Sequence, residues 1–262
     1  MGTSKSMETP SNGGWTAVKR GIPPSLGGSS SFSSDALIGG VINSSGGLGS
    51  GGSGGGGGGA GGDGGGGGAS VGGAVSGLGG FGAAVGSGGL DAAIERLGLD
   101  ELKDKPAIEV VAAVAEHLAE HADGPHHDLL ETALRDAILE CAAIEANGSY
   151  EDLETSLQSF LSSEGIEGLV ESFLSHFVFD RIWSWVEQHA TQKVELNGDT
   201  IAMASAVKES CRGHVEQLMD DIRDEGRFGT TDWFGQEGKQ LAEGIVGMLE
   251  FRLSLLSSEE SS

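Results

Sequence analysis

The chain has 262 residues, of which 48 are glycine, and a formal net charge of −24 at pH 7. Residues 1–89 hold 35 of the glycines and balance three basic against three acidic side chains, so the whole net charge lies after residue 89. This acidity excludes nucleic-acid binding by the later part, because phosphate contacts require Lys and Arg. The chain has no run of about 20 strongly apolar residues, so the sequence does not predict a transmembrane helix.

The first residues, MGTSKS, form a candidate modification site. Glycine has no side chain, so we expect the initiator methionine to be removed, which leaves an unhindered α-amine on Gly2. An α-amino pKa of about 7.7–8.0 makes part of this amine neutral and nucleophilic at cellular pH. The string also fits the M-G-x-x-x-[ST] pattern of N-myristoylation.

Residues 15–26, WTAVKRGIPPSL, form a short apolar and basic peptide. Its apolar side chains recur at helical spacing, but glycine and two prolines end any helix early. Two interpretations remain open: the peptide docks on a partner protein, or Trp15 packs back on the rest of the chain. We assign residues 1–26 to an N-terminal tip and docking peptide, with five candidate partner-binding residues: Trp15, Val18, Lys19, Arg20 and Ile22.

Residues 27–89 are rich in Gly and Ser and predict a disordered linker. A small island at 35–42 predicts a turn of helix capped by Asp35. A Gly-rich coil of about 45 residues spans about 35–40 Å, which suits delivery of the tip to an active site on another protein. Residues 68–89 contain glycines at GxxxG spacing. A linker whose last turns pack on the body is favoured over membrane insertion of this segment.

From residue 90 onward the apolar pattern becomes helical. No alternating pattern of useful length predicts a strand, so we expect an acidic all-α domain of about seven helices over 90–256, followed by a disordered tail at 257–262. The segment 164–189 is apolar nearly all round, which predicts a central, buried helix. Ser149 is expected to cap the helix after it. The expected helices cover 90–97, 106–122, 127–146, 150–162, 164–189, 200–225 and 235–256.

Chemical motifs are sparse. His117, Glu120 and His121 match the H-x-x-E-H pattern of a zinc hydrolase, and we keep this reading as an alternative. No Ser-His-Asp set or paired-cysteine metal motif occurs, and no cofactor is expected. Cys141 and Cys211 fall in helical patterns, and without a signal peptide we expect both thiols to be buried or half-buried in a reducing, cytoplasmic compartment.

Several stretches together resemble one family. They are the start MGTSKS, the Gly-rich middle, the segment GGLDAAIERLGLDELKDKPAIEVVAAVAEHL at 88–118, YEDLETSL at 150–157 and the aromatic helix SFLSHFVFDRIWSWV. Their order resembles QatB, the B component of the bacterial Qat anti-phage defence system. The run 51–68 departs from the family in being much richer in glycine.

This resemblance implies a role in phage defence beside a P-loop ATPase, a QueC-like enzyme and a TatD-like nuclease. QueC-like enzymes activate carboxyl groups with ATP, and the resemblance implies that one acts on the N-terminus, with Gly2 as the acceptor amine. We therefore expect a non-enzymatic component that presents its N-terminus to this partner. The rival hypotheses are the zinc hydrolase and a membrane-active effector that inserts residues 68–89.

Overall fold

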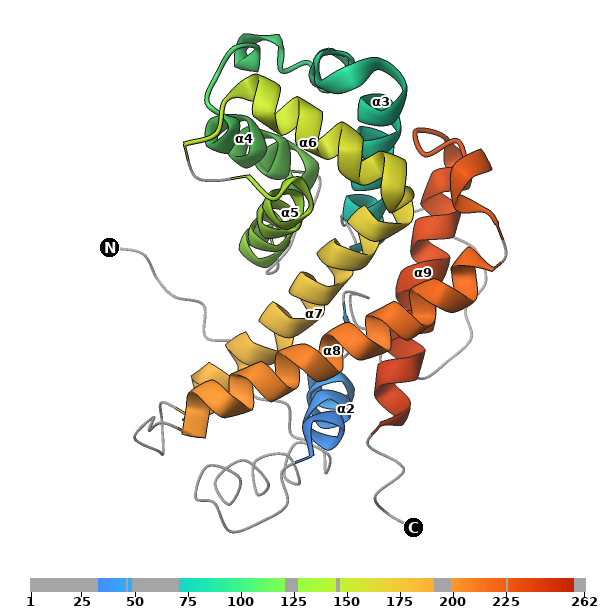
Figure 1. Ribbon diagram of the computed structural model, residues 1–262. Coiled ribbons are helices and arrows are strands. Elements are labelled where there is room, and N and C mark those ends of the chain that lie inside the picture. The colour runs from blue at the N-terminus through green and yellow to red at the C-terminus, as the bar shows by residue number, and fades with distance from the viewer. Residues whose placement is uncertain are drawn as a thin grey trace, which may run out of the picture.

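The computed structural model of the chain describes residues 33–45, 47–48, 71–120, 127–144, 147–190, 199–224 and 226–256. Over these residues the regular structure is helical throughout, which confirms the expected all-α class (Figure 1). The α-helices are α2 (Ser34–Ser45), α3 (Val71–Leu97), α4 (Ala107–Ala119), α5 (His127–Ala142), α6 (Tyr150–Ser163), α7 (Gly165–Ala190), α8 (Asp199–Arg223) and α9 (Gln236–Leu255). Two 3-10 helices, η1 (Asp100–Leu102) and η2 (Phe228–Thr230), complete them.

Helix α7 is the central element of the bundle. It crosses the middle of the molecule and packs against α2, α3, α5, α6 and α8 (Figure 1). A helix that is apolar nearly all round must be enclosed on several sides, so the structure confirms its predicted central position. The side chains of α7 with no exposed surface are Leu169, Val170, Phe173, Leu174, Phe177, Val178 and Ile182.

Local signals set several helix ends. The Ser149 hydroxyl accepts a hydrogen bond from the Asp152 backbone N–H at 3.2 Å, and the Asp152 carboxylate accepts from the Ser149 N–H at 3.0 Å. This reciprocal capping box starts α6 and confirms the predicted cap. Gly98, at φ +73°, ends α3 as predicted, because its missing Cβ permits the left-handed turn.

The prediction of a disordered linker over residues 27–89 is wrong for two segments. Residues 34–45 form α2, and residues 71–88 form the first part of α3. Residue 89 is a break within α3, where Gly89 has φ 83° and ψ 178°, and not the start of the folded part. Both segments enter the common core through Leu37, Ile38, Val41, Ile42, Val71, Val75, Leu78, Phe81 and Val85, none more than 7% exposed.

Glycine in α3 makes room for two aromatic side chains. A Cβ on Gly79 would overlap the ring of Trp233, and a Cβ on Gly80 would lie 2.7 Å from Cε1 of Phe234. Helix α9 and the turn before it therefore approach α3 closely at a position where larger residues do not fit. The guanidinium of Arg96 in α3 stacks over the Phe234 ring, 3.6 Å from its centroid, and adds a cation–π contact to this packing.

The cap of α2 also differs from the prediction. The Ser33 hydroxyl, and not Asp35, accepts the hydrogen bond from the Ala36 N–H, at 3.2 Å. Asp35 instead reaches α8. The tip and docking peptide at 1–26, most of the glycine run, and the tail at 257–262 lie outside the described residues.

Candidate functional site

None of the N-terminal candidates falls in the described part of the chain. Gly2 and the five candidate partner-binding residues (Trp15, Val18, Lys19, Arg20 and Ile22) all precede Ser33, the first described residue. Their roles stay predictions. The structure does show where the N-terminal segment joins the folded body. It also shows a pocket and a groove on the surface of that body.

The junction is α2, which is bound to the body by polar and apolar contacts. Asp35 accepts a hydrogen bond from the Ser210 hydroxyl and lies 3.1 Å from Nε2 of His214, both on α8. The hydrogen bond from Ser210 lowers the pKa of Asp35, with His214 adding to the effect against the opposing cost of burial. At the other end of α2, Asn43 Nδ2 donates to the Ser254 carbonyl oxygen on α9 at 2.9 Å.

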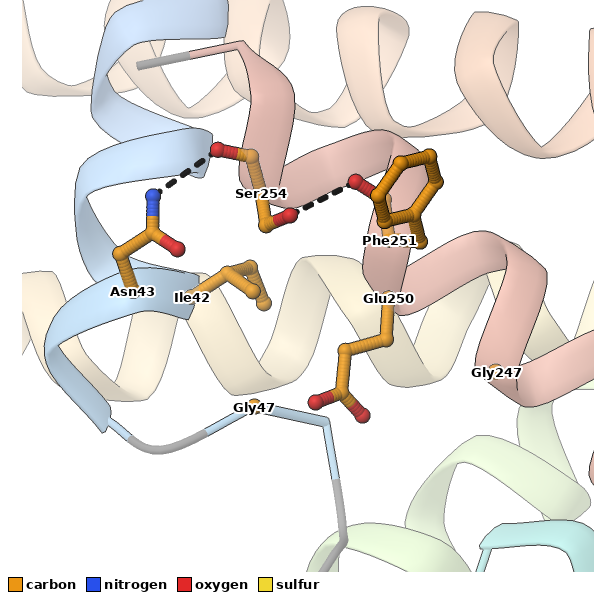
Figure 2. Close-up of a pocket in the computed structure, with 7 residues that line it drawn as sticks. All are labelled: Ile42, Asn43, Gly47, Gly247, Glu250, Phe251 and Ser254. Carbon is orange, nitrogen blue, oxygen red and sulfur yellow. Dashed lines mark hydrogen bonds between the residues drawn. The ribbon is translucent and has the colours of Figure 1, made fainter. Parts of the chain in front are cut away.

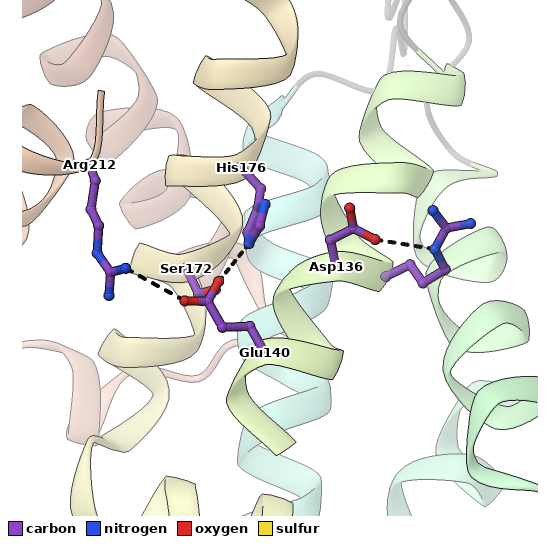
Figure 3. A network of polar contacts seen from close by, with 6 residues as sticks. Asp136, Glu140, Ser172, His176 and Arg212 are labelled. Atoms are coloured by element: carbon purple, nitrogen blue, oxygen red, sulfur yellow. Dashed lines mark hydrogen bonds and ion pairs between the residues drawn. The ribbon is translucent and has the colours of Figure 1, made fainter. Parts of the chain in front are cut away.

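The first hollow is a polar pocket between α5, α6, α7 and α8, with a volume of about 400 Å³. Glu140 of α5 lies at its centre, between His176 of α7 and Arg212 of α8 (Figure 3). One carboxylate oxygen is 2.6 Å from His176 Nε2, and the other is 3.7 Å from Arg212 Nη1. Ser172 donates a longer hydrogen bond of 3.4 Å to the same carboxylate.

Electrostatics in this pocket favour ionised Glu140. Burial opposes the charge, but the hydrogen bond with His176 and the electrostatic interactions with His176, Arg212 and Lys208 lower the pKa of Glu140 below its ordinary value. Glu171 differs, because burial outweighs its ion pair with Arg223 at 2.6 Å and raises its pKa. Glu140 and Glu171 thus pair with His176, Arg212 and Arg223 across α5, α7 and α8.

The pocket also contains a thiol of low reactivity. Burial raises the pKa of Cys141 to about 12, so the thiol stays protonated at neutral pH. Cys211 is buried too, and burial raises its pKa to about 12. Both cysteines are buried, which agrees with the expectation of buried or half-buried thiols. Paired charges and a protonated thiol can hold α5, α7 and α8 together, and they do not supply an activated nucleophile.

The second hollow is a groove between the C-terminal parts of α2 and α9, of about 500 Å³. Ile42 and Asn43 line it from α2, Gly47 from the turn after α2, and Gly247, Glu250, Phe251 and Ser254 from α9 (Figure 2). Phe251, which lines this groove, is 65% exposed, and Met248 and Leu255 on the same helix are 45% and 47% exposed. A set at i, i+3 and i+7 forms one apolar helix face. We call these three residues the α9 face.

The H-x-x-E-H candidate is only partly described. His117 Nδ1 and Glu120 Oε2 are 3.9 Å apart at the end of α4, and His121 lies outside the described residues. No group of three or more His, Cys, Asp or Glu side chains able to hold a metal ion occurs in the described part of the chain.

The candidate for membrane insertion was residues 68–89. Of these, residues 71–89 belong to α3 and pack in the core. Among the described helices, none combines the length and the apolar character that a bilayer crossing requires.

The structure therefore defines an all-helical body held together by its core and by paired charges. Residues 59–244 match the family described as Qat anti-phage system associated protein QatB. This match covers more than half of the chain, and the chain belongs to the QatB family. It confirms the resemblance inferred from the order of the motifs and makes the protein a component associated with an anti-phage defence system. Neither the curated proteins nor the solved structures gave a match.

Sequence reasoning missed both hollows. The sequence singles out neither Glu140 nor His176. The helical pattern places Glu140 on α5 and His176 on α7, but nothing local indicates that they meet. The groove was missed because α2 itself was not predicted beyond one turn.

Proposed function

We propose that the protein is a non-enzymatic component of the Qat defence complex that presents its N-terminus to a QueC-like enzyme for processing or conjugation at Gly2. The family assignment supports the setting in anti-phage defence. The remaining Qat proteins, a P-loop ATPase and a TatD-like nuclease, are the expected further partners.

The observation that carries this proposal is the anchoring of α2. Asp35 is hydrogen-bonded to α8 and Asn43 to α9, so the chain is attached to the body through α2. The segment that precedes this attachment, and that contains the candidate acceptor Gly2, is residues 2–32. A flexible coil of about 31 residues spans about 30 Å, which is enough to enter an active site on a neighbouring protein.

The arrangement of the body favours a scaffold over a catalyst. Glu140 and Glu171 of the polar pocket are paired with His176 and Arg223, and the Cys141 thiol is protonated. A modifying enzyme in contrast needs only an unhindered amine from this protein, and the α-amine of Gly2 supplies one.

The intact mass of the full chain, co-expressed with its genomic neighbours, tests the proposal. We expect a mass increase that peptide mapping places on Gly2 and that disappears when the QueC-like enzyme is omitted. An unshifted mass with a free Gly2 amine contradicts the proposal.

Two substitutions sharpen the test. Gly2→Leu retains the initiator methionine, because a bulky second residue hinders its removal, and should lose both the adduct and protection against phage. Gly2→Ala is the matched control: it keeps a small side chain and a free α-amine and should retain most of both. Both variants should keep the helicity of the wild type, measured by far-UV circular dichroism.

A further inference from the structure

The groove between α2 and α9 is negatively polarised as well as partly apolar. The C-terminal ends of both helices border it, and helix C-termini carry a partial negative charge. No basic residue lies in the last turn of α2. Arg252, in the last turn of α9, is engaged by Asp221 at 2.5 Å. The carboxylate of Glu250 lies in the groove next to Gly47 and adds a full charge (Figure 2).

Such a groove selects an apolar segment that carries basic residues and no acidic ones. The segment 15–26 of this chain has this composition: Trp15, Val18 and Ile22 recur at helical spacing, and Lys19 and Arg20 lie between them. A tryptophan side chain is also the residue type that most often anchors an interface in a pocket. We propose that residues 15–26 dock intramolecularly in the groove between α2 and α9, with Trp15 against the α9 face and the two basic residues toward Glu250.

The length of the chain permits this docking. Leu26 precedes Ser33 by seven residues, and seven extended residues span about 23–25 Å. From Ser34 to Asn43 the helix rises about 13–14 Å at 1.5 Å per residue. The segment therefore reaches from the start of α2 back along this helix to the groove, with several residues of slack.

Tethering also favours this occupant over a second copy of the protein. A segment on a short flexible linker has an effective concentration in the millimolar range. A second molecule at micromolar concentration must bind about a thousandfold more tightly to displace it. This inference does not depend on the modification of Gly2, and it selects one of the two readings left open for Trp15.

Limited proteolysis of the full chain with trypsin tests the docking. The bond after Arg20 lies within the proposed docked segment, and the bond after Lys5 lies outside it and is the internal reference. Phe251→Glu places a charge on the α9 face, and Trp15→Ser removes the proposed anchor. Ile201→Glu is the matched control: Ile201 is 79% exposed and lies 20 residues before Asp221 along α8, about 30 Å from the contact with Arg252.

We expect cleavage after Arg20 to be at least tenfold faster in Phe251→Glu and in Trp15→Ser than in the wild type and in Ile201→Glu, with cleavage after Lys5 unchanged. Equal cleavage after Arg20 in all four proteins overturns the inference. Light scattering tests whether a second copy of the chain occupies the groove instead. If the wild type is a dimer that Phe251→Glu dissociates, and cleavage after Arg20 is unchanged, the groove binds a second copy and the intramolecular docking is wrong.

Discussion

Replacing Gly79 of α3 by alanine tests whether glycine in this helix serves close packing. A Cβ at this position would lie 2.5 Å from Cδ2 and 2.7 Å from Cζ3 of Trp233, whereas ordinary contacts are 3.4–4 Å. The ring cannot easily withdraw. Trp233 is 2% exposed, its Nε1 donates to the Phe228 carbonyl at 3.2 Å, and its own carbonyl accepts from the Ser76 hydroxyl at 3.1 Å.

The magnitude follows from two opposing terms. Overpacking a buried site costs about 1–3 kcal/mol, and the fixed ring places this case near the upper value. Alanine stabilises the helix by about 1 kcal/mol relative to glycine, because its helix propensity is higher. We therefore expect the free energy of unfolding of Gly79→Ala to fall by about 2 kcal/mol. For a domain of this size that loss lowers the melting temperature by about 4–8 °C.

Gly86→Ala is the matched control in the same helix, because a Cβ there meets no atom within 4 Å. It should raise the free energy of unfolding by about 0.5–1 kcal/mol through helix propensity. Urea unfolding followed by circular dichroism at 222 nm measures both variants. If Gly79→Ala is as stable as Gly86→Ala, the steric reasoning is wrong. Adding Trp233→Ala should remove most of the penalty, since the clash partner is gone.

Three further predictions rest on single side chains. Ser149→Ala should lower the free energy of unfolding by about 1 kcal/mol through loss of the α6 cap, and an unchanged urea midpoint contradicts the capping role. Asp35→Asn should cost about 1 kcal/mol at pH 7, a low value because the side chain is half-exposed. The folded state lowers the pKa of Asp35 from 3.8, so the difference in free energy of unfolding between the wild type and Asp35→Asn should keep its full size above pH 4. It should shrink as the pH falls through the folded-state pKa of Asp35. Urea titrations that give a constant difference from about pH 7 to about pH 3 contradict this prediction. Cys141 and Cys211, whose pKa values burial raises from 9.0 to about 12, should react with iodoacetamide at pH 8 about a thousandfold more slowly in the native than in the denatured chain, and mass spectrometry that shows equal rates contradicts their burial.

Most of the body was predictable because its signals are local. Ser149 and Asp152 lie three residues apart and specify their helix start without help from the rest of the chain. The apolar pattern of α7 repeats over seven turns, so its central position also follows from the sequence alone. The glycine that ends α3, Gly98, is likewise a local signal.

The helices α2 and the first part of α3 were not predictable on the same basis. Each glycine destabilises a helix by about 1 kcal/mol relative to alanine, so the sequence of a segment such as 71–88 predicts a coil. Its apolar residues nevertheless recur at helical spacing, as in Val71, Val75 and Leu78, and all three are buried. Tertiary burial compensates for the poor propensity, and the partner that requires glycine, Trp233, lies more than 150 residues later.

The groove and the polar pocket depend on such distant pairs throughout. Asn43 meets Ser254 across 211 residues, and Glu140 meets His176 across 36. Each helix could be placed in the sequence, but the pairing of helices is decided by how their apolar faces fit together. The sites of a helical bundle are therefore the part that a single sequence leaves open.

The position of α2 changes what the glycine-rich run can do. The run lies between α2 and α3, and both of these helices pack in the core. A connection between two fixed points cannot extend the reach of the N-terminus, whatever its length. Each doubling of such a loop changes only its closure entropy, by about 0.6 kcal/mol. The reach of Gly2 is instead set by the residues before Ser34, and docking of residues 15–26 in the groove would shorten it further, to the span of the first 14 residues. A flexible chain of that length spans about 20 Å, so an enzyme that modifies Gly2 has to bind close to the ends of α2 and α9.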